Sequence, residues 1–562
     1  MSASLEALTE RYLGFIAAEQ PVAATYLGLH SRDDSLGLFS ADALASQRGK
    51  LSEILLDLEK LKTDDLDADE RVDAAVLRAM LRRAVFDHDH LKRHELDPGY
   101  YIGTALTGCN QLLMRDFAPL EERARCFASR LRDVPDVLAE CLENVKSPPS
   151  TFASVGAEMA RGGLAFLTEV VPRLSAELPE LGADLERASA GASDALLEIA
   201  AHCEEAASSS DVPFHVGREA YEWLLRETHM LKMDSDELLE FGRDSIAETS
   251  RAMDELAREI DPSATWRETV ERLQTHHPEP GTLREFYASE MAEARDFVRE
   301  KNLVTIPPGE SLDVVDTPTF LRTLLPYAAY GPPGPFETEQ KGFFYVTPVD
   351  AQASPEDQER QLRGHWVDNI RVIALHEGYP GHHVQLVRSN QVPSRTRKLA
   401  GNNVFIEGWA LYCEEMMREA GFFPDAGTRL CQLKATMWRA ARIVVDVGLQ
   451  RGEMSLTDAA DFMVSEAALV RDKAEAEVKR YAKYPTQPSS YLIGKRAILG
   501  IRDSYERTMG ASFNLLEFHD RLLDVGSIPP ALAEQALGLG DGTTSAAEPS
   551  GGGREGAAGA AT

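Results

Sequence analysis

The feature that most constrains the fold is a helical spacing of apolar residues, which recurs along most of the 562-residue chain. Apolar side chains repeat at intervals of three and four residues in segments 41–61, 122–145 and 234–260, as on one face of an α-helix. The last segment begins at Asp234 and Ser235, and either residue can cap a helix start. No strand–helix–strand alternation and no repeat of about 20–50 residues accompanies this spacing. We therefore predict a mainly α-helical protein.

The composition changes after about residue 300. Segment 306–350 is rich in proline, glycine and aromatic residues, and it holds one strand candidate, "GFFYVTP", at Gly342–Pro348. Helical spacing resumes near Gln358 and runs to about Gly526. The Gly/Ala-rich tail, 541–562, has almost no large apolar residue and is predicted to be disordered. We expect one large domain over 1–540, with an N-terminal helical half of about 1–300 and a second half of about 301–540.

The net charge and the cysteines limit which partners and which cellular compartment the sequence supports. The net charge of −32 argues against nucleic acid, because phosphate binding needs clustered lysine and arginine. No run of about 18 apolar residues is present, so no membrane span is expected. The start of the chain shows no basic region followed by an apolar run, and the six cysteines are dispersed. We therefore expect a cytoplasmic protein with buried thiols.

The stretch "ALHEGYPGHHVQ", 374–385, begins like the metal-binding helix of a zinc protease. His376 and Glu377 open the motif, but Pro380 stands where the second histidine is usual, and His382 and His383 follow later. On a straight helix, His382 points roughly 120° away from His376, and His383 lies roughly 10 Å further along the axis. Neither can share a metal ion with His376 unless the helix is interrupted.

Pro380 and Gly381 can provide that interruption. Proline removes a helical hydrogen bond and crowds the carbonyl of His376, and glycine tolerates the unusual dihedral angles that follow. Two looped-out residues return a histidine to the side of His376, so "HEGYPGH" is interpreted as a rebuilt zinc motif. From spacing alone, either His382 or His383 can be the ligand, and a solvated His-Glu pair is the alternative.

A third ligand is expected on the later helix "NNVFIEGWALYCEEMMREA", 402–420. Glu407 lies there among large apolar residues, and a buried carboxylate is unfavourable unless it is paired or metal-bound. Glu414 is seven residues further on the same face, where it can orient a histidine. Glu415 is assigned to the solvated side. The alternative for each glutamate is an ordinary surface carboxylate.

Several motifs together resemble one bacterial family. They are "HEGYPGHHVQ", "FIEGWALYCE", "FFYVTP", "RAARIVVDVGL", "PSSYLIGK" and "FHDRLLDVGSIPPALAE". The chain is similar to the bacterial domain of unknown function 885 family from "PVAATYLGLH" to about residue 536. That family resembles the Taq-type thermostable zinc carboxypeptidases, which implies a mainly α fold with two helical halves around a deep cleft, and a Zn²⁺ cofactor. The histidine after Pro-Gly recurs in the family, so the resemblance favours His382 as ligand and leaves His383 a supporting role.

The remaining roles follow from peptidase chemistry. Glu377 is the predicted general base, unless it only pairs with an arginine. Tyr491 is the predicted oxyanion donor, because such peptidases often place a late tyrosine there; Tyr481 and Tyr484 are alternatives.

A carboxypeptidase also needs a cation for the terminal carboxylate of its substrate. Arg442 and Arg439 are the candidates, and an Arg442–Asp446 pair within the helix is the alternative. "GFFYVTP", with Tyr345, is a candidate edge strand for an extended peptide, or plain core.

The favoured function is a zinc-dependent hydrolase of peptide or amide bonds, a metallocarboxypeptidase-like enzyme for short peptides. Pro380 stands where the second histidine of the zinc motif is usual. This supports an alternative function, a non-catalytic protein that binds peptides on a degenerate peptidase fold. A metal hydrolase of a non-peptide amide is a third hypothesis.

Overall fold

Helices make up most of the computed structural model, which describes residues 4–317, 322, 325 and 327–539. The predicted mainly α fold is confirmed. Segments 41–61, 122–145 and 234–260 form α3 (Ala41–Glu59), α7 (Leu120–Asn144) and α11 (Ser235–Ile260). Asp234 caps α11 by accepting hydrogen bonds from the backbone N–H groups of Asp236 and Glu237. The predicted disordered tail lies outside the described residues.

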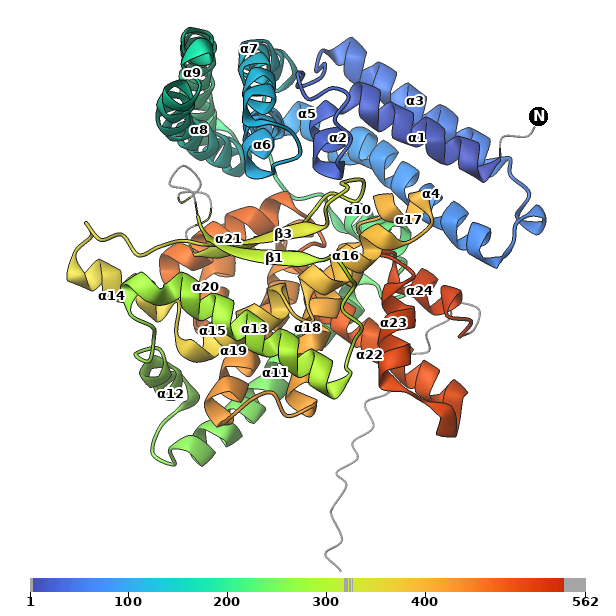
Figure 1. The fold of residues 1–562 in the computed structure, drawn as a ribbon, viewed down its shortest axis with the longest axis vertical. Coiled ribbons are helices and arrows are strands. Elements are labelled where there is room, and N and C mark those ends of the chain that lie inside the picture. The colour runs from blue at the N-terminus through green and yellow to red at the C-terminus, as the bar shows by residue number, and fades with distance from the viewer. Residues whose placement is uncertain (1–3, 318–321, 323–324, 326, 540–562) are drawn as a thin grey trace, which may run out of the picture.

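The helices form two groups (Figure 1). The N-terminal group lies above the sheet in that view, and the second group lies around and below it. The N-terminal group consists of α1 (Leu5–Glu19), α2 (Pro21–Leu27), α3, α4 (Ala68–Phe86), α5 (Arg93–Leu96), α6 (Pro98–Met114), α7, α8 (Ser150–Glu177) and α9 (Pro179–Ser209).

The second group contains the sheet and the C-terminal helices. Its helices are α10 (Arg218–Trp223), α11, α12 (Trp266–Leu273), α13 (Leu283–Lys301), α14 (Pro355–Arg363), α15 (Val367–Glu377), α16 (His382–Gln391), α17 (Arg395–Leu399), α18 (Asn403–Glu419), α19 (Ala426–Gln450), α20 (Leu456–Ala467), α21 (Arg471–Lys483), α22 (Ser490–Met509), α23 (Leu515–Leu523) and α24 (Pro530–Ala536).

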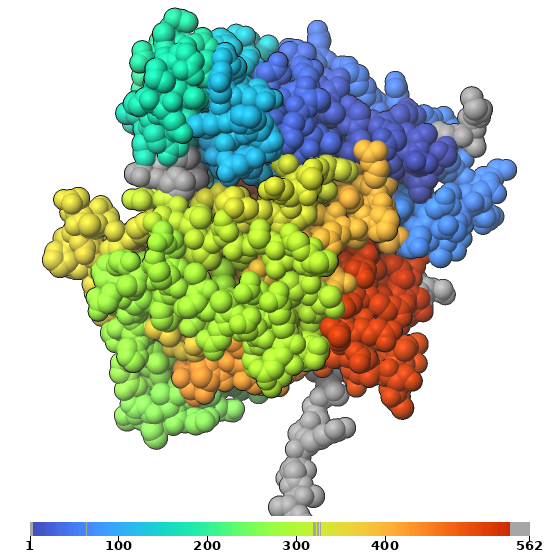
Figure 2. Space-filling view, in the orientation of Figure 1, coloured from blue at the N-terminus to red at the C-terminus, as the bar shows by residue number. Residues whose placement is uncertain are grey.

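The packing boundary between the groups lies between α9 and α10. Helix α11 packs along α19, and α13 packs on α15, so both belong with the C-terminal elements. The structural change therefore comes near residue 210, about 90 residues before the change in composition. The two groups meet along a seam in the space-filling view (Figure 2). The deep cleft expected between two halves stays a prediction.

The sheet has three strands in the order β1 (Ser311–Asp316), β3 (Lys341–Val346) and β2 (Ala328–Gly331). Strand β3 confirms the predicted strand, but it pairs in parallel with β1 and antiparallel with β2. The edge-strand prediction for "GFFYVTP" is therefore wrong, because both of its hydrogen-bonding edges are occupied. Tyr345 is only 5% exposed, as expected of a core residue, and its role in substrate binding stays a prediction.

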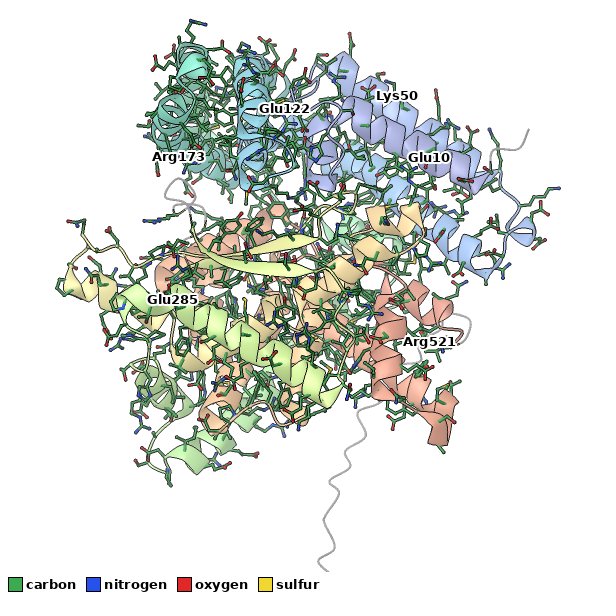
Figure 3. The ribbon with its side chains drawn as sticks, in the orientation of Figure 1. Glu10, Lys50, Glu122, Arg173, Glu285 and Arg521 are labelled. Carbon is green, nitrogen blue, oxygen red and sulfur yellow. The ribbon has the colours of Figure 1, made fainter. Side chains whose placement is uncertain are left out.

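Charged side chains cover the outside of both groups. Six exposed examples come from α1, α3, α7, α8, α13 and α23 (Figure 3): Glu10, Lys50, Glu122, Arg173, Glu285 and Arg521. Among the helices of the described residues, none combines the length and the apolar character of a membrane span.

Candidate metal centre

The backbone between α15 and α16 makes the detour that the motif requires. Helix α15 ends at Glu377, and α16 begins at His382 after a cis Tyr379–Pro380 peptide bond. Gly381 closes the detour against α15, and its N–H donates to the carbonyl of Leu375 over 3.0 Å. A Cβ at Gly381 would overlap the carbonyl oxygen of His376, so this position requires glycine.

The detour brings His376 and His382 side by side. Their ring centroids are 4.9 Å apart and the rings are nearly perpendicular, at 87°. One ligand atom each from His376, Glu377 and His382 lies within 4.8 Å of the other two. The two histidines are almost enclosed, with 6% and 8% of their surfaces exposed. Residues six apart in the sequence thus converge as a metal site needs.

His383 lies on the other side of the detour. Its Nε2–H donates to Oε2 of Glu310 over 2.6 Å, and its Nδ1 lies 3.0 Å from the hydroxyl of Tyr330. The hydroxyl of Tyr379 donates to the same Glu310 oxygen over 2.8 Å. Both ring nitrogens are therefore engaged, and His383 anchors the detour to the sheet region instead of facing the candidate ion.

Glu407 lies on α18, and its carboxylate is close to the ring of His382. Its Oε2 is 3.3 Å from Nε2 of His382. Two donors on one zinc ion, with bonds of about 2.1 Å and tetrahedral angles, lie about 3.4 Å apart. Burial raises the pKa of the Glu407 carboxyl. The interaction with His382 outweighs this effect and lowers the pKa to about 2. The carboxylate is ionised, as a metal ligand must be.

Glu414 orients His376, as predicted from its place on the face of Glu407. Its Oε1 accepts the Nδ1–H of His376 over 2.8 Å, and the carboxylate is fully buried. This bond fixes the tautomer and leaves the lone pair of Nε2 available. Arg439 also lies near this carboxylate, with its Nη2 3.9 Å from Oε1 of Glu414.

Two close helix contacts hold α18 against the detour and against α22. The indole N–H of Trp409 donates to the carbonyl of Pro380 over 3.0 Å. Gly408 and Gly494 let α18 and α22 touch, and a Cβ on either would overlap the backbone of the other helix. This contact sets Tyr491, near the start of α22, beside Glu407, where it helps to lower the pKa of that carboxyl.

Glu377 is half-buried and forms no hydrogen bond or ion pair with any residue that the structure describes. The alternative reading, in which it only pairs with an arginine, is therefore wrong for the described part of the chain. A carboxylate beside two histidines and without a partner of its own is free to accept a proton.

Arg442 is buried and its donors are largely engaged. Its Nε donates to the hydroxyl of Tyr481 over 2.8 Å, and its Nη2 is 3.4 Å from Glu477. Asp446 instead accepts hydrogen bonds from the hydroxyls of Tyr221 and Ser489, over 2.8 and 2.6 Å. The alternative, an Arg442–Asp446 pair within the helix, is therefore wrong, and the substrate role of Arg442 stays a prediction.

Arg439 is the freer of the two arginines. Its Nη1 donates to the carbonyl of Ala435 over 3.2 Å, whereas its buried Nε has no hydrogen-bond partner among the described residues. Of the alternative tyrosines, Tyr481 is buried against Arg442, and Tyr484 lies against Arg93 with 42% of its surface exposed. Tyr491 alone of the three contacts a candidate ligand.

Sequence reasoning missed Glu310 and Tyr330, the partners of His383. Both lie in the proline- and glycine-rich segment, where no periodicity marks a contact with a helix more than 50 residues away. It also missed Lys434 and Lys473, which stand beside the two arginines. Helical spacing could have found Lys434, which lies one turn before Trp438 on the same helix, but it gives no signal for Lys473 on another helix.

Comparisons with known proteins extend over nearly the whole chain. A protein from Shewanella oneidensis, called a "putative lipoprotein of unknown function", has a solved structure with TM-score 0.79 and 24% identity, covering 95% of this chain and 100% of its own. A "putative lipoprotein" from Colwellia psychrerythraea gives TM-score 0.81 and 19% identity, covering 96% and 99%. No curated protein matches.

The likeness to Taq-type zinc carboxypeptidases stays a prediction. The family described as "Bacterial protein of unknown function (DUF885)" matches residues 21–537. The chain therefore belongs to the DUF885 family.

Proposed function

We propose that the protein is a Zn²⁺-dependent hydrolase of peptide or amide bonds, which removes residues from the C-termini of short peptides. The observation that carries this proposal is the convergence of His376, Glu377 and His382 within 4.8 Å, with Glu407 3.3 Å from His382. Two imidazoles and one carboxylate form the His₂Glu donor set of catalytic zinc sites, so the residues fit the ion. His376, His382 and Glu407 would hold it.

Zinc supplies a Lewis acid that polarises a carbonyl and lowers the pKa of water. Glu377 takes the proton of the attacking water and delivers it to the leaving amine. Its lack of any partner among the described residues supports this role. Tyr491 is the candidate donor to the developing oxyanion, because it lies beside the proposed ligand Glu407.

Arg439 is the candidate for the terminal carboxylate of the substrate. Its unpartnered Nε and its position behind Glu414 set a guanidinium close to the metal donors. Planar, bidentate recognition suits a carboxylate better than the point charge of a lysine does.

Elemental analysis and digestion of a peptide library test this function. We expect one zinc per chain, and stepwise loss of C-terminal residues by mass spectrometry. Glu377→Gln should retain the zinc and lose turnover, whereas His376→Ala should lose both. Intact peptides after digestion by the zinc-loaded protein would contradict the proposal and favour the peptide-binding alternative, for which Pro380 is the supporting observation.

We propose the cytoplasm as the compartment. All six cysteines are free thiols and five are buried, which is typical of a reducing environment. The structural relatives are called lipoproteins, a name that implies export for them. Cell fractionation followed by immunoblotting for this protein tests the compartment. Protein in the soluble cytoplasmic fraction agrees with the proposal, and protein in the membrane or periplasmic fraction contradicts it.

A further inference from the structure

Four cations stand together beside the candidate metal centre. Lys434, Arg439 and Arg442 come from α19, and Lys473 comes from α21; we call these four residues the cationic cluster. Three of them surround one indole: the ring centroid of Trp438 is 4.2 Å from Cζ of Arg442, 4.5 Å from Nζ of Lys473 and 5.8 Å from Cζ of Arg439. Lys434 is one helical turn before Trp438 and lowers the pKa of Lys473, so it belongs to the same group.

The described residues neutralise the cationic cluster only in part. Two carboxylates pair with its four cations among the described residues: Glu414, 3.9 Å from Arg439, which also accepts from His376, and Glu477, 3.4 Å from Arg442, which is shared with Arg480 at 2.9 Å. Lys434 and Lys473 form no ion pair or hydrogen bond with any residue in the described part of the chain. This surplus of positive charge occurs in a protein whose net charge is −32. Nothing in the overall composition accounts for it.

Keeping these charges together is unfavourable without an anion. Lys473 is partly buried, and burial together with the charge of Lys434 lowers its pKa to about 8. Burial and the charge of Arg439 likewise lower the pKa of Lys434. Uncompensated cations in a partly buried position favour binding of a negatively charged ligand, and such groups are typical of functional sites.

The cationic cluster lies next to the candidate metal ligands, with one residue between them on each side. On one side, His376 bonds to Glu414, and Arg439 is 3.9 Å from that carboxylate. On the other side, Tyr491 lies beside Glu407 and under Arg442, with 4.7 Å between the guanidinium carbon and the ring centroid. The candidate metal ligands and the cationic cluster are therefore close enough for one short peptide to contact both.

We infer that the cationic cluster selects peptides whose C-terminal residue is glutamate or aspartate. Such a residue carries two carboxylates: Arg439 receives the terminal one, and Lys434 with Lys473 receives the side chain. Two arginines and two lysines match this dianion better than they match a single terminal carboxylate. The inference rests on the proposed peptidase function, and it names the substrate class of the same site.

The test compares acetyl-Ala-Ala-Ala-Ala-Glu with the same peptide ending in glutamine, which differs by one charge. With zinc-loaded wild type, we expect kcat/KM to be at least about tenfold higher for the Glu peptide, since hydrogen bonds to charged groups have this strength. Lys473→Met and Lys434→Met should each reduce that ratio to about threefold or less. Lys479→Met is the matched control: it also lies on α21, but its ammonium pairs with Glu158 over 2.7 Å, and it should keep the ratio.

A binding arm separates this inference from the proposed function. Fluorescence anisotropy measures the affinity of both peptides, labelled at the N-terminus, for the same four proteins. Cleavage of both peptides at equal rates would overturn the inference and leave the peptidase function standing. Absence of cleavage, with tighter binding of the Glu peptide that depends on Lys434 and Lys473, would support the inference and overturn the peptidase function. Equal binding without cleavage would overturn both.

Discussion

Removing the carboxylate of Glu414 should weaken zinc binding without removing a ligand. Its Oε1 accepts the Nδ1–H of His376 over 2.8 Å, and the side chain is fully buried. A hydrogen bond to a charged group contributes about 1.5–3 kcal/mol, and a partner of this kind typically changes metal affinity about 10–100-fold. We expect Glu414→Gln, which keeps an acceptor oxygen, to raise the Kd for zinc about tenfold, and Glu414→Ala about 100-fold.

Competition with a chromophoric chelator at fixed pH measures both affinities. Glu415→Ala is the matched control, because Glu415 is the next residue but pairs with Arg418, Arg429 and Lys495 on the other side of α18. It should lose stability and keep its zinc affinity. An unchanged Kd in Glu414→Ala would refute the reasoning that this carboxylate holds His376 in its ligand tautomer.

Three further predictions address packing, pH and substrate. Gly494→Ala should destabilise the fold by about 3 kcal/mol or more in urea unfolding, because its Cβ would overlap the backbone of α18; Gly500→Ala, further along α22 in open space, should be nearly neutral or stabilising. Burial raises the pKa of Asp446 to about 7, so the folded state binds a proton more tightly than the unfolded state. The free energy of unfolding should therefore fall by roughly 1–4 kcal/mol as the pH rises from about 4 to 7. Asp446→Asn should remove that loss, and equal pH profiles for the two proteins would contradict this. Arg439→Met should raise KM about tenfold for a free C-terminus and leave KM for an amidated peptide unaltered; equal effects on both would exclude contact with the terminal carboxylate.

The helices and the break between His376 and His382 were predictable because their signals are local. Segment 234–260 carries its own cap and apolar face, and the position of Gly381 after Pro380 signals a break in the helix. The orientation of Glu414 also followed from helical periodicity, since it shares a face with Glu407.

Other parts of the site depend on contacts between distant segments. The role of His383 is set by Glu310 and Tyr330, 73 and 53 residues away, and adjacent histidines give no indication of which one faces the ion. Strand β3 looked like an edge because its neighbours β1 and β2 lie in a proline- and glycine-rich segment, where neither was recognised as a strand. No local pattern distinguishes a central strand from an edge strand when its neighbours are unrecognised.

The most direct test of the metal centre is anomalous diffraction at the zinc absorption edge from crystals of the zinc-loaded protein. We predict one strong peak at about 2.0–2.2 Å from a ring nitrogen of His376, from a ring nitrogen of His382 and from a carboxylate oxygen of Glu407. A peak bound by His383 and Glu310, or no peak between α15, α16 and α18, would contradict the account.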